Sequence, residues 1–254
     1  VHDLIPFRLP ADYRMARRVR VPSVALLRRA HRVIAVSRAT AKDVVRFARV
    51  PPDRISVIHE GVDPAFHPER PEVVDQLLGR LGIRRPYLLG VGTFDPRKRV
   101  SLLAEVTRRV AVATDAQLVI AGEQASFLPA VQAAIRDAGI EGRTVTAGHQ
   151  DAAALRALYS GAACLVFTSS YEGFGLPPLE AMACGAPVVG FANSSVGEVC
   201  GDAAMLFRDG DVNAMTQSVL QLLHDDAKRA ELVRAGAARA ARFSWRDAAQ
   251  RTLE

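Results

Sequence analysis

One stretch of the sequence combines two carboxylates with a glycine loop. Glu172 lies in the loop formed by residues 169–176 and Glu180 follows it, so the two acids flank Gly-Phe-Gly-Leu-Pro-Pro at residues 173–178. An apolar run typical of a buried strand precedes the loop, and the two prolines suit the first turn of a helix. A strand, a glycine loop and a helix start together expose backbone N–H groups that bind phosphate. We predict this role for the backbone of Gly173, Phe174, Gly175 and Leu176.

The two carboxylates suit the hydroxyl groups of a sugar. Glu180 is expected in the first helical turn, where it can accept hydrogen bonds from a ribose, although a helix-start acid without a ligand is the alternative. Glu172 lies in the loop, where a carboxylate can hold sugar hydroxyls or stabilise an oxocarbenium-like centre. Gly-x-Gly is half of a dinucleotide fingerprint, but Pro178 occupies its last position, which argues against an oxidoreductase.

A second cluster, Gly-Thr-Phe-Asp-Pro-Arg-Lys-Arg at residues 92–99, follows another apolar run. Lys98 offers a point charge and Arg97 a planar fork of donors, and both suit a diphosphate. Cations after a glycine are commonly solvated, but the ends of parallel strands share one sheet edge, so this cluster is expected close to Glu172. The predicted ligands are Gly92, Thr93, Arg97 and Lys98, and Lys98 is also expected to stabilise a leaving group.

The elements around these clusters alternate between strand and helix. Strands are predicted at 87–91, 117–121, 144–147, 164–168, 187–191 and 204–207, and segments with helical periodicity separate them. This cadence predicts a doubly wound, mostly parallel, Rossmann-like α/β domain. Residues 1–65 hold fewer elements than a domain core needs and are interpreted as a partial N-terminal α/β domain with a hinge. Residues 66–235 form the predicted ligand-binding domain, and residues 236–254 a helical segment that packs back toward the N-terminal part.

The two clusters resemble the signatures of retaining GT-B glycosyltransferases of the family 4 type, the glycosyl transferases group 1. The spacing Glu-x7-Glu around Gly-Phe-Gly-Leu-Pro-Pro matches, and so does Gly-Thr-x-x-Pro-Arg-Lys. The resemblance implies that Lys98 contacts the diphosphate of a donor, that Glu172 lies near its sugar and that Glu180 meets its ribose. Thr93 stands where some relatives carry an arginine, so a second cationic contact is absent there.

The resemblance extends from His2 to Trp245. His2 in Val-His-Asp-Leu-Ile-Pro is similar to a histidine that faces the cleft in this family, although a histidine near a chain end is more often incidental. Val-Ser-Arg-Ala-Thr at 36–40 and His-Glu-Gly-Val-Asp at 59–63 also match, as strand-end and hinge positions. Glu198 resembles a family position that we interpret as structural or near the nucleotide. Several strands and helices of the family's N-terminal domain have no counterpart in this sequence.

The resemblance implies transfer of a hexose, with retention, from a nucleoside diphosphate sugar to a glycan or glycolipid acceptor in polysaccharide, lipopolysaccharide or glycolipid assembly. Mannose from GDP-mannose is chosen on the resemblance alone. No cofactor and no metal are expected, because the sequence has no Asp-x-Asp motif and its histidines lack ligand spacing. Two alternatives stay open: a nucleotide-sugar-binding module without turnover, since this chain alone carries little of one wall of the cleft, and a GT-B epimerase of sugar nucleotides.

Charge and cysteine content limit the partners and the compartment. The net charge is +6, and residues 1–54 contain 13 Lys and Arg against four Asp and Glu. This basic segment suits anionic lipid at the cytoplasmic face of a membrane, a phosphorylated acceptor or plain solvent, whereas nucleic acid is disfavoured because aromatic residues are only 6%. Three cysteines without metal-site spacing indicate a reduced, cytoplasmic protein, and there the sequon Asn193-Ser194-Ser195 is a coincidence.

Overall fold

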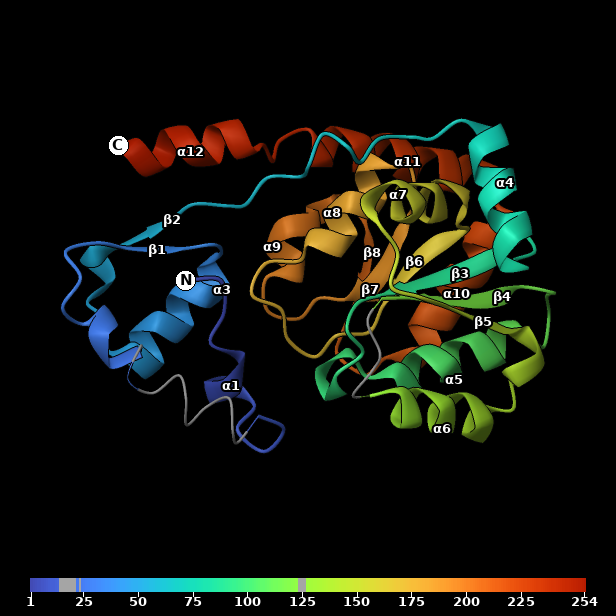
Figure 1. Ribbon diagram of the computed structural model, residues 1–254, viewed down its shortest axis with the longest axis horizontal. Helices are drawn as coiled ribbons and strands as arrows, with labels where there is room; N and C mark the ends of the chain where they lie inside the picture. The colour runs from blue at the N-terminus through green and yellow to red at the C-terminus, as the bar shows by residue number, and fades with distance from the viewer. Residues whose placement is uncertain (14–21, 23, 123–126) are drawn as a thin grey trace.

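The computed structural model describes residues 1–13, 22, 24–122 and 127–254. Within these residues the chain forms a large α/β part and a smaller part beside it (Figure 1). The large part contains, in the described residues, a parallel sheet of six strands in the order β5-β4-β3-β6-β7-β8. The predicted doubly wound α/β domain is confirmed. The strands are β3 (Tyr87–Val91), β4 (Gln117–Ala121), β5 (Thr144–Gly148), β6 (Cys164–Phe167), β7 (Val188–Phe191) and β8 (Met205–Phe207).

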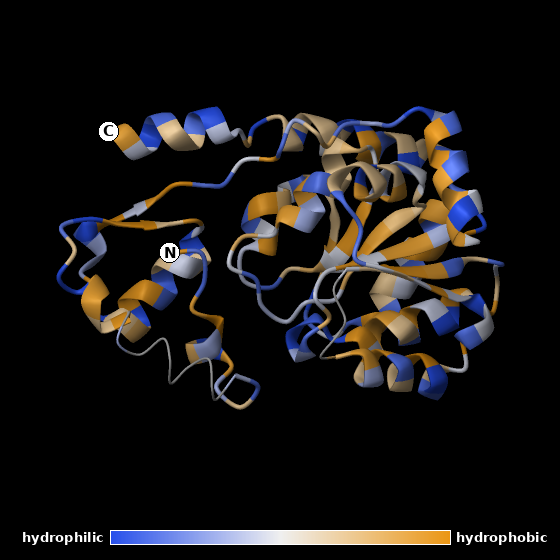
Figure 2. Cartoon of the chain, viewed as in Figure 1, coloured by the Kyte–Doolittle hydropathy of each residue, from blue (hydrophilic) through white to orange (hydrophobic). Residues whose placement is uncertain are grey.

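The strand order places β3 and β6 next to each other at the centre of the sheet, with Leu88 opposite Cys164 and Leu89 opposite Leu165. Successive residues of a strand face opposite sides of a sheet, so each of these strands supplies both core layers. Leu89 and Leu165 belong to one buried cluster, and Leu88 and Cys164 to the other. Figure 2 shows the apolar residues concentrated in these strands.

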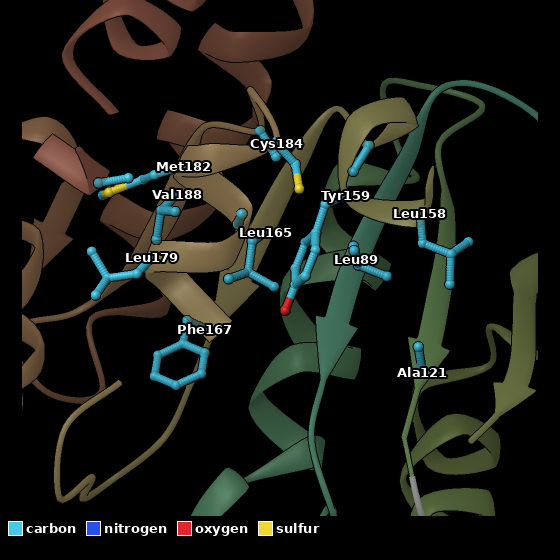
Figure 3. Packing of buried hydrophobic residues seen from close by; sticks show 14 of the residues in the cluster. Leu89, Ala121, Leu158, Tyr159, Leu165, Phe167, Leu179, Met182, Cys184 and Val188 are labelled. Atoms are coloured by element: carbon cyan, nitrogen blue, oxygen red, sulfur yellow. The ribbon is translucent and has the colours of Figure 1, made fainter. Parts of the chain in front are cut away.

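Helices cover both faces of the sheet (Figure 1). One layer contains α4 (Pro71–Leu81), α7 (Ala152–Gly161), α8 (Leu176–Ala183), α9 (Val196–Cys200) and α11 (Asp226–Ala240). The opposite layer contains α5 (Val100–Val110), α6 (Leu128–Ala138) and α10 (Val212–His224). In the first layer the ring of Tyr159 lies between Leu165 of β6 and Leu89 of β3 (Figure 3). This close packing fixes α7 and α8 over the central strands.

The smaller part contains α1 (Ile5–Arg8), β1 (Val33–Ala35), α3 (Arg38–Asp43), a π-helical turn (Val44–Ala48) and β2 (Ile55–Val57). In the described residues β1 and β2 form a parallel pair around a small apolar cluster. Val1 continues this sheet, because Val36 N–H donates to the Val1 carbonyl over 3.3 Å. The pairing places His2 at the carboxyl end of β1.

The chain crosses between the two parts twice, and the two crossings touch. Val62 N–H donates to the Phe243 carbonyl over 3.1 Å, and Val62 bridges Ser244. A Cβ on Gly61 would overlap the backbone of Trp245, so only glycine permits this approach. The predicted boundary at residue 236 falls inside α11, and α12 (Trp245–Leu253) then reaches the smaller part, where Arg251 donates to the Val57 carbonyl of β2 over 2.9 Å.

Candidate functional site

The loops that follow β3 and β6 meet at the carboxyl edge of the sheet, as parallel topology requires. Together with the first residues of the chain they enclose a cavity of about 360 Å³. The described lining includes every predicted site residue except Glu180 and adds four that the sequence did not indicate. The lining residues are His2, Asp3, Ile5, Glu60, Gly92, Thr93, Arg97, Lys98, Glu172, Gly173, Phe174, Gly175, Leu176 and Pro177.

Two cations converge on one carboxylate in this cavity. Lys98 Nζ lies 2.7 Å from Glu172 Oε1, and Arg97 Nη1 lies 2.6 Å from the same oxygen. Arg97 Nε lies 3.2 Å from Asp95, which holds the guanidinium from its other side. Lys98 and Glu172 are 7% and 8% exposed, so water screens this cluster poorly. Two cations and two carboxylates are therefore fixed beside the glycine loop, and their formal charges balance until another anion displaces a carboxylate from Lys98 and Arg97.

The burial of these groups alters their protonation. Burial alone would raise the pKa of the Glu172 carboxyl, but the charges of Lys98 and Arg97 outweigh it and hold the pKa below its ordinary value. Burial lowers the pKa of Lys98, although Glu172 opposes this shift. The ammonium also lies 4.7 Å above the ring centre of Phe167, which attracts a cation. A second anion arriving beside Lys98 would favour its charged form further.

The backbone around Lys98 is closely built. Gly92 has φ +144°, and a Cβ there would come within 2.8 Å of Lys98 Cε, so glycine lets the lysine lie against the strand end. Phe94 and Arg99 adopt left-handed φ of 50° and 48° without being glycine. Such conformations cost roughly 1–2 kcal/mol each and concentrate at functional sites. The loop is held in place from β6, because Thr168 Oγ1 donates to the Lys98 carbonyl over 2.7 Å.

Glu180 departs from its predicted position. The helix begins at Leu176 behind Gly175, which has φ +118°, so Glu180 is the fifth residue of α8 and lies beyond the first turn. Its Oε2 accepts a hydrogen bond of 2.9 Å from the hydroxyl of Tyr159. Burial raises the pKa of this carboxyl, and the Tyr159 bond partly offsets the rise. The contact with a ribose stays a prediction, since Glu180 is not part of the cavity lining that the described residues form.

The opposite wall pairs His2 with an acid that the sequence did not single out. His2 Nδ1 lies 2.6 Å from Glu60 Oε1. The His2 side chain is 80% exposed, whereas that of Glu60 is 10% exposed. Glu60 can therefore fix the Nδ1 edge of the imidazole, while the rest of the exposed ring stays accessible from the cavity. The motif His-Glu-Gly-Val-Asp, which we interpret as a hinge, contains Glu60, and this acid in a matched motif is the signal by which the sequence could indicate a site residue.

The glycine loop is anchored to the smaller part. Ser37 Oγ donates to the Gly173 carbonyl over 2.6 Å, and Thr40 Oγ1 donates to the same oxygen over 3.0 Å. Ser37 also caps α3, because its Oγ accepts from the Thr40 N–H. A Cβ on Gly173 would overlap the His2 carbonyl, so glycine permits the contact between the two parts. Glu198 adds a second link: it lies 2.7 Å from His59 Nε2 and accepts from the Arg38 N–H over 2.9 Å.

The segment Asn193-Ser194-Ser195, which follows β7, holds the same loop through hydrogen bonds. These residues therefore have a structural role, whatever their match to a glycosylation sequon. Ser194 Oγ accepts the Glu172 N–H over 2.7 Å. Ser195 Oγ contacts the carbonyl oxygens of Glu172 at 3.0 Å and Phe174 at 2.5 Å. These hydroxyls follow a strand end at the active edge of the sheet, and that placement was the signal available in the sequence.

In residues 1–13, 22, 24–122 and 127–254, no helix has both the length and the apolarity to cross a membrane. In the same residues, no three His, Cys, Asp or Glu side chains gather as the ligands of a metal ion would.

Comparisons with known proteins identify the family and the fold. The family model described as Glycosyl transferases group 1 matches residues 80–239, and that of Glycosyltransferase Family 4 matches residues 1–66. The O-antigen chain mannosyltransferase B of Escherichia coli is 31% identical over 258 residues, which are 99% of this chain and 68% of the relative. The serotype-specific mannosyltransferase WbdA of Escherichia coli is 28% identical over 268 residues, covering 100% of this chain and 32% of WbdA.

Solved structures agree on the fold. Anabaena Alr3699/HepE, in complex with UDP and glucose, superposes with a TM-score of 0.86 at 22% identity, over 100% of this chain and 69% of that one. Sucrose-phosphate synthase from Thermosynechococcus elongatus gives 0.82 at 24% identity, over 100% and 65%. The fold is that of the GT-B glycosyltransferases. The chain belongs to the glycosyl transferases group 1, a family of glycosyltransferase enzymes, which confirms the resemblance.

Proposed function

We propose that the chain transfers a hexose from a nucleoside diphosphate sugar to a glycan or glycolipid acceptor, with retention of configuration. The observation that carries this proposal is the convergence of Lys98 and Arg97 on Glu172 beside the glycine loop. Fixed cations and backbone N–H groups are what a departing diphosphate needs. Mannose is the proposed sugar and GDP-mannose the proposed donor, since relatives are named as mannosyltransferases.

In this proposal the donor diphosphate takes the place of Glu172 as the partner of Lys98 and Arg97. The carboxylate of Glu172 then turns to the donor sugar, and Glu180 to the ribose. The bond between the sugar C1 and the diphosphate oxygen breaks while the acceptor oxygen bonds to C1 from the same face. The acceptor proton passes to the departing phosphate oxygen, so charge and atoms balance. His2, held by Glu60, contacts the sugar from the opposite wall.

We propose that donor and acceptor bind to different parts of the chain, divided near the predicted boundaries. Residues 66–235 and the remainder of α11 hold the donor, while residues 1–65 belong to the acceptor side and α12 packs back toward them. WbdA is about three times as long as the region it shares with this chain, so the activity, acceptor and linkage of the whole protein are part of the proposal. We also propose that it works in the cytoplasm without a cofactor or metal. Its three cysteines are buried and unpaired, which suits a reducing compartment.

The test is a transfer assay. Purified protein is mixed with GDP-mannose, UDP-glucose or dTDP-glucose and with a mannose-rich glycan, with and without a chelator. We expect diphosphate release that depends on the acceptor and persists with the chelator, and an α-linked product from the α-linked donor by NMR. Nucleotide binding without turnover, for this chain and for a version extended to the length of its relatives, would indicate a binding module. Isomerised donor without an acceptor would indicate an epimerase.

A further inference from the structure

A second cavity, of about 400 Å³, lies between the two parts of the molecule. It shares the glycine loop with the first one: Tyr171 lines this cavity, and the adjacent Glu172 lines the other. Ser194 also lines it, and the hydroxyl of Ser194 holds the Glu172 N–H. The described lining consists of Arg8, Arg38, Ala39, Lys42, Asp43, Tyr171, Ser194 and Glu198.

Three cations from the smaller part face this cavity. Arg38 and Lys42 lie four residues apart in α3, on the same side of the helix, and Arg8 ends α1. The side chains of Arg38 and Lys42 form no ion pair or hydrogen bond with any residue that the structure describes. Like charges one helical turn apart repel each other, and an anion between them removes the repulsion. An anion is therefore the ligand that these two side chains favour.

The two acids in the lining offset only part of this charge, because three cations face two carboxylates and leave one formal positive charge in excess. Asp43 accepts a 2.5 Å hydrogen bond from the Tyr171 hydroxyl and lies 3.6 Å from Arg8 Nη1. Glu198 is held by His59 and by the backbone N–H of Arg38. The cavity thus keeps an excess of positive charge at Arg38 and Lys42.

We propose that this cavity binds a phosphate group through Arg38, Lys42 and Arg8. An arginine fork and a lysine point charge suit the three oxygens of a phosphate better than the two of a carboxylate. A volume of about 400 Å³ also accommodates a sugar attached to that phosphate. That the phosphate is carried by the acceptor rests on the proposed function. The phosphate would anchor the acceptor in the cavity that Tyr171 lines, and Tyr171 directly precedes Glu172 in the chain.

The test compares two double variants that remove the same charge. Arg38→Gln/Lys42→Gln changes the cavity, and Arg29→Gln/Arg136→Gln removes two exposed arginines that do not line it. Calorimetric titrations use inorganic phosphate, mannose 1-phosphate and, as the uncharged control, mannose. We expect the cavity variant to lose about tenfold or more in affinity for both phosphates, while the control variant keeps the affinity of the unaltered protein. Equal affinities in all three proteins, or equal losses in both variants, would overturn the proposal.

Two further measurements separate the possible causes. All four substituted residues are exposed, so the thermal midpoints of the variants should match that of the unaltered protein. Co-sedimentation with phosphatidylglycerol vesicles identifies the source of the phosphate. If only Arg38→Gln/Lys42→Gln loses vesicle binding, the phosphate belongs to a lipid headgroup. If both double variants lose vesicle binding equally, the phosphate belongs to a soluble acceptor. Phosphate binding that depends on Arg38 and Lys42, without any glycosyl transfer, would reject the proposed function but support this phosphate site. Glycosyl transfer without such phosphate binding would support the proposed function but reject this phosphate site.

Discussion

The hydroxyl of Ser37 donates a 2.6 Å hydrogen bond to the carbonyl oxygen of Gly173, a residue 136 positions further along the chain. Both partners are buried. The same hydroxyl caps α3 by accepting the N–H of Thr40. One small side chain therefore joins the start of a helix in the smaller part to the glycine loop of the donor site.

Ser37→Ala is expected to lower the free energy of unfolding by about 1–3 kcal/mol, because it removes a helix cap and leaves one donor fewer for the buried Gly173 carbonyl. Urea unfolding measures this loss. Ser101→Ala, at an exposed position in α5, is the matched control and should change stability by no more than about 0.5 kcal/mol. Equal behaviour of the two variants would contradict the assigned role of Ser37.

Gly173→Ala is expected to destabilise the protein by about 1–3 kcal/mol, because the added Cβ would overlap the His2 carbonyl and push the two parts away from each other. Gly79→Ala is the control inside α4, where a Cβ meets no atom of the described residues within 4 Å. It should stabilise the protein by about 0.5–1 kcal/mol, since alanine is the better helix former. Thermal and urea unfolding measure the change in stability of each variant. A change in the same direction for both variants would refute the steric argument.

Lys98→Ala is expected to weaken binding of a nucleoside diphosphate roughly tenfold to a hundredfold, which is the range for losing a charge-assisted hydrogen bond. Calorimetric titration measures the affinity, and the corresponding nucleoside, which has no phosphate, should bind the variant as it binds the unaltered protein. Lys228→Ala removes a lysine whose ion pair with Glu231 lies at the surface, and it should leave both affinities unchanged. An unchanged diphosphate affinity in Lys98→Ala would remove this residue from the donor site.

Glu180→Gln is expected to change how stability depends on pH. Burial raises the folded-state pKa of Glu180 above its ordinary value of 4.5. The group therefore contributes stability that is fully present below pH 4.5 and is lost as pH rises through the folded pKa. The glutamine variant keeps an acceptor for the Tyr159 hydroxyl but lacks this titration. The stability of the unaltered protein relative to the variant should fall with pH.

The measurement is urea unfolding of both proteins at intervals from about pH 4 to about pH 7, because differences between two proteins cancel the titration of all other shared groups. A difference that stays constant, or that grows in favour of glutamate at higher pH, would show that Glu180 is not a buried acid with a raised pKa.

Local pattern predicted the sheet, because the strands other than β5 are short, mainly apolar runs and the helices between them carry apolar stripes. The loops at residues 92–99 and 169–176 were predicted for the same reason, since glycine and charge lie next to strand ends. The two prolines lie in the first turn of α8 as predicted, but the helix already begins at Leu176 before them, and Glu180 therefore falls in its second turn.

The supports of the site were not predictable from local pattern. Glu60, Ser194 and Ser195 are single polar residues in segments far along the chain from the groups they hold, and their spacing in the sequence carries no periodic signal. Their roles arise only when the two parts of the molecule pack together. The loops that carry the candidate site residues can therefore be predicted from the sequence. The hydrogen bonds that orient these loops can be identified only from the three-dimensional structure.

The paired crossings at Val62 and Ser244 restrict how the molecule can open. Two adjacent covalent connections allow rotation about one line but oppose sliding and twisting. Opening about that line would separate Ser37 from Gly173 and Arg38 from Glu198. Opening would also part Tyr171 from Asp43 and so divide both cavities in the same movement. A molecule that fills either cavity would therefore favour the closed arrangement of the other, so each ligand would strengthen the binding of the second.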